Sequence, residues 1–144
     1  MVYLRLLNTS KKFIMSKEEL IELIEKLELP KDEYYILSSG CLALYDLRDK
    51  VGDLDLCISN ELFENFKKKY GIKEEDKNEC GFYKLNELIE FVVNDKKNFV
   101  RDFRMGYPVE KLEKVLEFKK RMNRPKDVND IKKIEEFLGK KQES

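Results

Sequence analysis

The chain has 144 residues, and its 29 Lys plus Arg balance its 29 Asp plus Glu, so the formal net charge at pH 7 is zero. It contains no histidine, which excludes Ser-His-Asp and Cys-His catalysis and any histidine-ligated zinc. The balanced charge excludes a global attraction to nucleic acid or to an anionic membrane. Acid and base chemistry must therefore fall to carboxylates, lysines or metal-bound water.

The apolar runs and the cysteines bear on the compartment. The longest apolar runs are only a few residues, and the amino terminus lacks the apolar segment of a signal peptide, so we expect a cytoplasmic protein with no membrane partner. Cys41, Cys57 and Cys80 are odd in number, lack C-x-x-C spacing and stand among apolar residues. This pattern predicts reduced, buried thiols.

The first half of the chain predicts alternating helices and strands. Ser16 with Glu19 forms a capping box that opens a helix ending before Pro30. The run "YYILS" predicts a strand, and "CLALYDL" a short helix after a Ser-Gly break. The run "DLDLCIS" predicts another strand, and a helix capped by Ser59 or Asn60 should stop at Gly71.

The second half predicts a hairpin followed by two helices. The runs "GFYKL" and "LIEFVV" should pair across Asn86. Residues 94–108 mix basic and aromatic side chains, which suit either core packing or stacking on a nucleic acid. Helices are predicted at about 109–122 and 126–138. We therefore expect an α/β (α+β) fold, a mixed β-sheet with flanking helices, as a single domain over 1–144 with the helix pair 109–138 packed on it.

Two aspartates stand inside an otherwise apolar strand. Asp53 and Asp55 share one face of that strand, while Leu54 and Leu56 share the other. Like charges side by side repel unless water or a cation screens them, so the pair is either a solvated face or a metal site. Because carboxylates are abundant and soft ligands scattered, the metal favoured is Mg²⁺ or Mn²⁺.

Other polar residues can complete a site around these aspartates. The Ser39-Gly40 turn lies between a strand and a helix, an arrangement that can hold a phosphate. Glu90 lies in the apolar strand "LIEFVV", where it could join the metal ligands and accept a proton, although Glu87 competes for that role. Three carboxylates from two strands beside a phosphate-holding turn would suit metal-assisted nucleotidyl transfer.

The run "SSGCLALYDLRDKVGDLDL" resembles the signature of the DNA polymerase beta-like nucleotidyltransferase superfamily. The turn matches Ser39-Gly40, and the signature's helix alanine, arginine and paired acids match Ala43, Arg48, Asp53 and Asp55. The run "LEFKKRMNRPKDVNDIKKIEEFL" is similar to the tail of small bacterial members. The chain departs from the pattern in three ways, with Ser39 and Asp46 at positions where glycine is common and Val51 where Ser or Thr is common.

The resemblance implies transfer of a nucleoside monophosphate from a nucleoside triphosphate to a hydroxyl, with release of pyrophosphate. It implies Mg²⁺ (or Mn²⁺) on Asp53, Asp55 and Glu90, and phosphates at Ser39 and Gly40. A small molecule, a tRNA or a protein would be the acceptor. The alternative is a catalytically silent protein of the same fold that binds a nucleotide or a partner, as an antitoxin does.

Three basic residues have two interpretations each. Arg48 either contacts a phosphate or solvates its loop. Lys119 continues an apolar helical stripe, so it should point toward the body of the protein. It either pairs with Asp127 to fix the two helices or, like Lys126, reaches the triphosphate or the acceptor.

Overall fold

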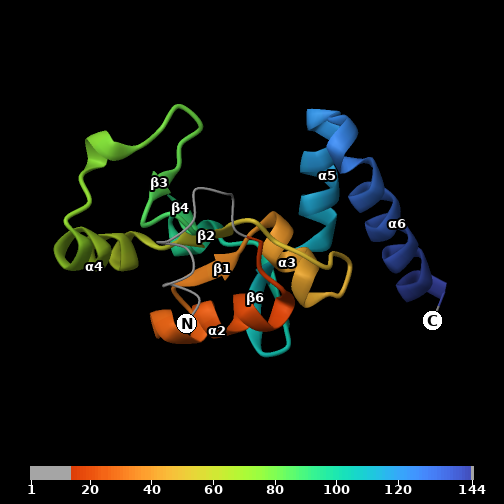
Figure 1. Ribbon diagram of the computed structural model, residues 1–144, viewed down its shortest axis with the longest axis horizontal. Coiled ribbons are helices and arrows are strands. Elements are labelled where there is room, and N and C mark those ends of the chain that lie inside the picture. Colours follow the sequence, from red (N-terminus) through yellow and green to blue (C-terminus); the bar gives the residue numbers. More distant parts are fainter. Residues whose placement is uncertain (1–13, 144) are drawn as a thin grey trace.

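The structure is a computed structural model that describes residues 14–143. Within that range six strands form one mixed sheet, in the order β3-β4-β2-β1-β6-β5, and helices flank it (Figure 1). The strands are β1 (Tyr34–Ile36), β2 (Leu54–Ile58), β3 (Tyr83–Lys84), β4 (Ile89–Val93), β5 (Arg101–Arg104) and β6 (Tyr107–Glu110). The helices are α2 (Lys17–Leu27), α3 (Ser38–Leu44), α4 (Asn60–Tyr70), α5 (Leu112–Met122) and α6 (Val128–Glu143), with the short 3₁₀ segments η1 (Glu74–Asp76), η2 (Lys96–Asn98) and η3 (Pro125–Asp127). The predicted fold class, α/β (α+β) with a mixed sheet and flanking helices, is confirmed.

Strand directions gather several chain segments at one end of the sheet. β1 runs antiparallel to β2 and parallel to β6, whereas β2 runs parallel to β4. The carboxyl ends of β1 and β6 therefore lie at the same end of the sheet as the amino ends of β2 and β4. Asp53 and Asp55 at the start of β2, and Glu110 at the end of β6, are brought to that end by topology alone.

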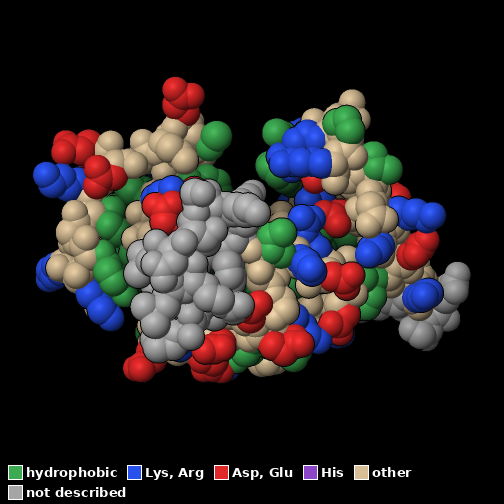
Figure 2. All heavy atoms as spheres, in the orientation of Figure 1, with side chains coloured by type: hydrophobic (Ala, Val, Ile, Leu, Met, Phe, Trp, Pro, Cys, Tyr) green, Lys and Arg blue, Asp and Glu red, His purple; other side chains and the backbone are tan. Residues whose placement is uncertain are grey.

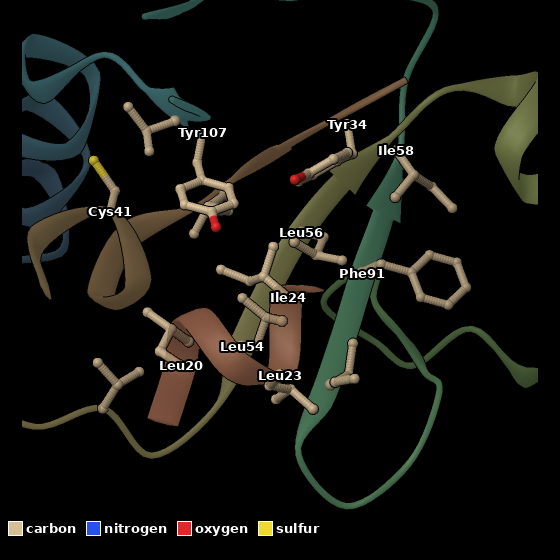
Figure 3. Close-up of a cluster of buried hydrophobic side chains, with 14 of the residues drawn as sticks. Leu20, Leu23, Ile24, Tyr34, Cys41, Leu54, Leu56, Ile58, Phe91 and Tyr107 are labelled. Carbon is tan, nitrogen blue, oxygen red and sulfur yellow. The ribbon is translucent and has the colours of Figure 1, made fainter. Parts of the chain in front are cut away.

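Apolar side chains from the central strands and from α2 form the core (Figure 3). Leu54 and Leu56 of β2 are fully buried, and Leu20 and Ile24 of α2 point toward them in Figure 3. Phe91 of β4 stacks on Tyr83 of β3, with ring centroids 5.2 Å apart. This packing fixes the back of the strand that carries the two aspartates.

The helix ends follow the predicted capping signals. The Ser16 side chain accepts the Glu19 N–H while the Glu19 side chain accepts the Ser16 N–H, a capping box that opens α2. Ser59, rather than Asn60, caps α4, and Gly71 ends it at φ 68°, a left-handed conformation that glycine adopts without strain. Among the helices of residues 14–143, none combines the length and the apolar character needed to cross a membrane.

A second hairpin in residues 101–110 was not predicted. β5 and β6 pair antiparallel across Met105 and Gly106, both at positive φ, as in a type I′ hairpin turn. The helix predicted from residue 109 is therefore wrong at its start, because Val109 and Glu110 belong to β6 and α5 begins at Leu112. β6 is paired on both sides, with β5 and β1, although it contains Pro108, a residue type that usually excludes a segment from the interior of a sheet.

The cysteine prediction holds for two of the three thiols. Cys41 and Cys57 are buried free thiols, but Cys80 is exposed, so the expectation of burial is wrong for that residue. Cys80 lies in the charged loop between α4 and β3, where its backbone N–H donates to the Asn78 side chain. Burial raises the pKa of the Cys41 thiol, which makes it a poor nucleophile.

Candidate functional site

A cavity of about 440 Å³ opens at the end of the sheet where these strand ends meet. That volume lies within the range of about 300–1,000 Å³ that small-molecule sites occupy. Figure 2 shows the molecule hollowed between the segment around β3 and helix α5. Its charged lining residues come from the sheet, from the loop before β2 and from the α5–α6 connection, and they are Asp53, Asp55, Glu110, Arg48, Lys119, Arg124, Lys126 and Asp127.

Asp53 and Asp55 form the acidic wall of the cavity. Both carboxylate side chains are half-buried and line the cavity, whereas Leu54 between them and Leu56 beyond are buried on the other side. This is the alternation that the sequence predicted. Two carboxylates thus face one solvent-accessible space from a strand whose back is fixed by the core.

Glu90 lies beside this wall, without lining the cavity itself. In the parallel pairing of β2 with β4, Glu90 is the register partner of Asp55, so the two side chains are neighbours on one face of the sheet. Glu87, the competing residue, is exposed and pairs with Lys84 at 3.4 Å. Over residues 14–143 no three Asp, Glu, Cys or His side chains are grouped so as to hold a metal ion by themselves.

The turn after β1 contributes serine side chains to the cavity, but not Gly40. Ser38, at φ 43°, and Ser39 both line the cavity. Gly40 is buried, and a Cβ built there would lie 2.7 Å from Cγ2 of Ile36. The structure therefore gives Gly40 a packing reason: it lets α3 approach β1 closely.

The second charged wall of the cavity holds Lys119 with Arg48, Arg124 and Asp127, and Asp130 pairs with Lys119 without lining the cavity. Lys119 is only 3% exposed, and its Nζ donates to Asp127 at 3.1 Å and lies 3.4 Å from Asp130. Arg124 donates to the other oxygen of Asp127 at 2.6 Å, and Arg48 donates to Asp130 at 2.6 Å. The Lys119–Asp127 pair expected under the structural interpretation is present, and Lys119 also lines the cavity.

The electrostatics of this wall follow from those bonds. Burial alone would raise the pKa of Asp127, but hydrogen bonds from Arg124 and Lys119 outweigh it and hold the pKa below its usual value. Lys126 lines the cavity, is exposed, and has no ion pair within the described part of the chain. Unlike Arg48, Lys119 and Arg124, Lys126 can therefore bind an anion without losing an ion pair.

Glu110 is a cavity residue that sequence analysis missed. It ends β6, and its carboxylate accepts the backbone N–H of Ser38 at 3.0 Å. Burial raises the pKa of Glu110. The hydrogen bond from Ser38 and the positive charge of Lys119 act in the opposite direction, but the effect of burial is larger. Recognising β6 as a strand that ends beside β1 was the signal that could have found it.

The three departures from the superfamily pattern have local structural settings. Asp46 adopts φ 60°, the left-handed conformation that glycine, Asn and Asp tolerate best, and its carboxylate pairs with Lys17 at 2.7 Å. Val51 is fully buried and bridges to Met15, so the loop offers Gly52 to the cavity in its place. Ser39 adds a hydroxyl to the cavity wall.

Comparisons of this chain with protein-family models, with curated proteins and with solved structures found no match. The resemblance to the nucleotidyltransferase superfamily stays a prediction that rests on the residues quoted for it.

Proposed function

We propose that the protein is a metal-dependent nucleotidyltransferase that moves a nucleoside monophosphate from a nucleoside triphosphate to a hydroxyl acceptor. The observation that carries the proposal is the cavity itself, in which Asp53 and Asp55 face a wall of basic side chains. A triphosphate needs cations for its charge, and its metal needs carboxylates. One cavity offers both, from opposite sides.

The proposed metal site is completed by the substrate. Mg²⁺ is commonly bound through one or two carboxylates together with substrate phosphates. Asp53 and Asp55 supply two, and Glu90 stands next to Asp55, so the residues fit a metal that arrives with a nucleotide. Bound there, Mg²⁺ (or Mn²⁺) would neutralise charge on the triphosphate and acidify the attacking hydroxyl.

The chain's own groups take the remaining roles in this proposal. Lys126 and the Ser39 hydroxyl bind phosphate oxygens, while Arg48 and Lys119, which line the cavity and are each paired with a carboxylate, add positive charge. The acceptor oxygen attacks the α-phosphorus, the bond to pyrophosphate breaks, and the hydroxyl proton passes to a carboxylate. Glu90 is the predicted proton acceptor, and Glu110, which lines the cavity, is a second candidate.

Thermal melting with each nucleoside triphosphate, with and without magnesium, tests the binding half of the proposal. We expect a magnesium-dependent rise in melting temperature in the parent and none in Asp53→Asn, because that variant loses a ligand charge. Asp49→Asn is the matched control, since Asp49 is exposed and does not line the cavity. Equal melts for the parent and Asp53→Asn would contradict the metal assignment.

Label transfer tests the chemical half. The protein is incubated with α-labelled triphosphates, magnesium and a cell extract, and the fractions containing small molecules, tRNA and protein are separated. Label that enters one fraction with the parent, and not with Asp53→Asn, identifies the acceptor class. Label in no fraction would contradict the enzyme proposal.

The silent, nucleotide- or partner-binding alternative is favoured by one observation: the described residues hold no preformed group of three metal-binding side chains. Under that alternative, no label would move, and a triphosphate would either stabilise the protein equally with and without magnesium, if it binds a nucleotide, or leave the melting temperature unchanged, if it binds only a partner. The two experiments therefore separate the alternatives without a known acceptor.

A further inference from the structure

Helix α5 presents one aromatic ring to the cavity. Phe118 is 37% exposed and lines the cavity, next in sequence to the buried Lys119. A ligand that covers this ring buries its apolar surface, and such burial is favourable. A ligand with a flat apolar face would gain that free energy in this cavity.

Two arginines border the same ring. The guanidinium carbons of Arg121 and Arg124 each lie 5.7 Å from the Phe118 ring centroid. Arg124 also lines the cavity and is held by its 2.6 Å hydrogen bond to Asp127, which Lys119 binds in turn. Guanidinium planes stack on aromatic rings and on nucleobases, so Phe118 and Arg124 are two neighbouring groups on which a base can stack.

A second aromatic residue lies across the cavity. Phe82, just before β3, lines the same cavity and is half-buried. Its backbone is fixed by Asn78, whose side chain accepts the Phe82 N–H at 2.9 Å while the Asn78 N–H donates to the Phe82 carbonyl at 2.8 Å. β3 and α5 lie on opposite sides of the molecule in Figure 1, with the hollow of Figure 2 between them, and the cavity is lined by Phe82 from the β3 side and by Phe118 from α5.

We infer that Phe118 and Arg124 form the subsite for the base of the nucleoside triphosphate, with Phe82 on the facing wall. The inference rests on the proposed function and adds to it how the non-reacting end of the substrate is recognised. Stacking accepts any base, because every base has a π face. The subsite therefore selects for a nucleobase as a class and against an anion without one.

The absence of tryptophan from the sequence makes a direct test possible. Phe118→Trp places the single indole of the protein on the proposed platform, and stacking of ATP or GTP should quench its fluorescence. Inorganic tripolyphosphate, which carries the charge without a base, should not. Phe103→Trp is the matched control, because Phe103 is 57% exposed, lies outside the cavity and also has an arginine, Arg101, over its ring.

Calorimetric titration with the same probes measures the contribution of the platform. Phe118→Ala should weaken ATP binding about tenfold, within the range for loss of one stacked base, and leave tripolyphosphate binding unchanged. Equal affinities of the parent for ATP and tripolyphosphate, an equal loss for both in Phe118→Ala, or quenching as strong in Phe103→Trp would overturn the subsite and leave the anion-binding cavity standing. A parent that binds neither ligand would overturn the proposed function, and the subsite with it.

Discussion

The two walls of the cavity are held in place by opposite kinds of burial. Behind Asp53 and Asp55, the sheet buries apolar side chains such as Leu54, Leu56 and Ile36, whose packing is non-directional. Behind the facing wall, the end of α5 and its connection to α6 bury charges instead, with Lys119 and Asp127 both nearly inaccessible. The sheet wall should therefore respond to lost volume, and the helical wall to lost charge.

Truncating a sheet side chain should produce the largest effect. Leu56→Ala removes a fully buried side chain from β2 and should lower the free energy of unfolding by about 3–4 kcal/mol, from lost transfer energy and the residual cavity. Val128→Ala is the control, because Val128 is 64% exposed and its truncation should change stability little. Urea denaturation measures both, and similar midpoints for the two variants would contradict the apolar account of this wall.

Removing the buried lysine should produce the next largest effect. Lys119→Met keeps most of the volume but leaves Asp127 and Asp130 without their shared cation. We expect a loss of about 3 kcal/mol, the lower end for breaking a buried pair, because Arg124 and Arg48 still face the two carboxylates.

The neighbouring lysine provides the control for that loss. Lys120 is exposed and pairs with Glu135 at 2.7 Å on the solvent side of the helices. Lys120→Met should change stability by less than about 1 kcal/mol, because exposed ion pairs contribute little. If both variants lost equal stability in urea denaturation, burial would not distinguish the two pairs, and the charge-based account of the helical wall would be wrong.

A glycine substitution separates packing from phosphate binding at the predicted turn. Gly40→Ala should destabilise by about 1–2 kcal/mol, because its new Cβ would crowd the branched Ile36 by more than the helix propensity of alanine offsets. Gly139→Ala, also helical but with no atom within 4 Å of the added Cβ, should be neutral or stabilising. A Gly40→Ala variant of full stability would contradict the packing role, whatever its effect on triphosphate binding.

Local patterns predicted the sheet wall better than the helical wall. The alternation around Leu54 and Leu56 was enough to place Asp53 and Asp55 on one face, because a strand fixes side-chain direction over a few residues. The spacing of Lys119 on its helix predicted a buried lysine, and its pairing with Asp127 was one of two interpretations. That Asp130 shares the lysine and takes Arg48 depends on contacts between distant segments, which periodicity does not report.

Glu110 shows where local reading failed. The sequence predicted a helix from about residue 109, but Val109 and Glu110 belong to strand β6. Tertiary pairing prevailed, because β6 lies between β1 and β5 and Val109 pairs with Ile36. The Glu110 carboxylate at the end of that strand reaches the cavity only through this pairing. Its proposed role as a proton acceptor therefore depends on the same pairing.

The smallest expected effect is a gain in stability when Glu110 is replaced by glutamine. Burial raises the pKa of this carboxyl, so the folded state holds its proton more tightly than the unfolded state does. Below the ordinary value of 4.5 both states are protonated and ionisation has no effect on stability. As the pH rises through the raised folded pKa, the buried carboxyl ionises and the parent loses stability.

Glu110→Gln removes that loss and keeps a side-chain oxygen to accept the Ser38 N–H. Melting at pH 4 and pH 8 should therefore show the variant gaining on the parent at the higher pH, by up to about 1 kcal/mol. Glu136→Gln, an exposed change on α6, should show no such pH dependence. A Glu110→Gln variant whose advantage fails to grow with pH would contradict the burial account, whereas a more stable protein with slower nucleotidyl transfer would show that the charge at Glu110 serves the cavity at the expense of the fold.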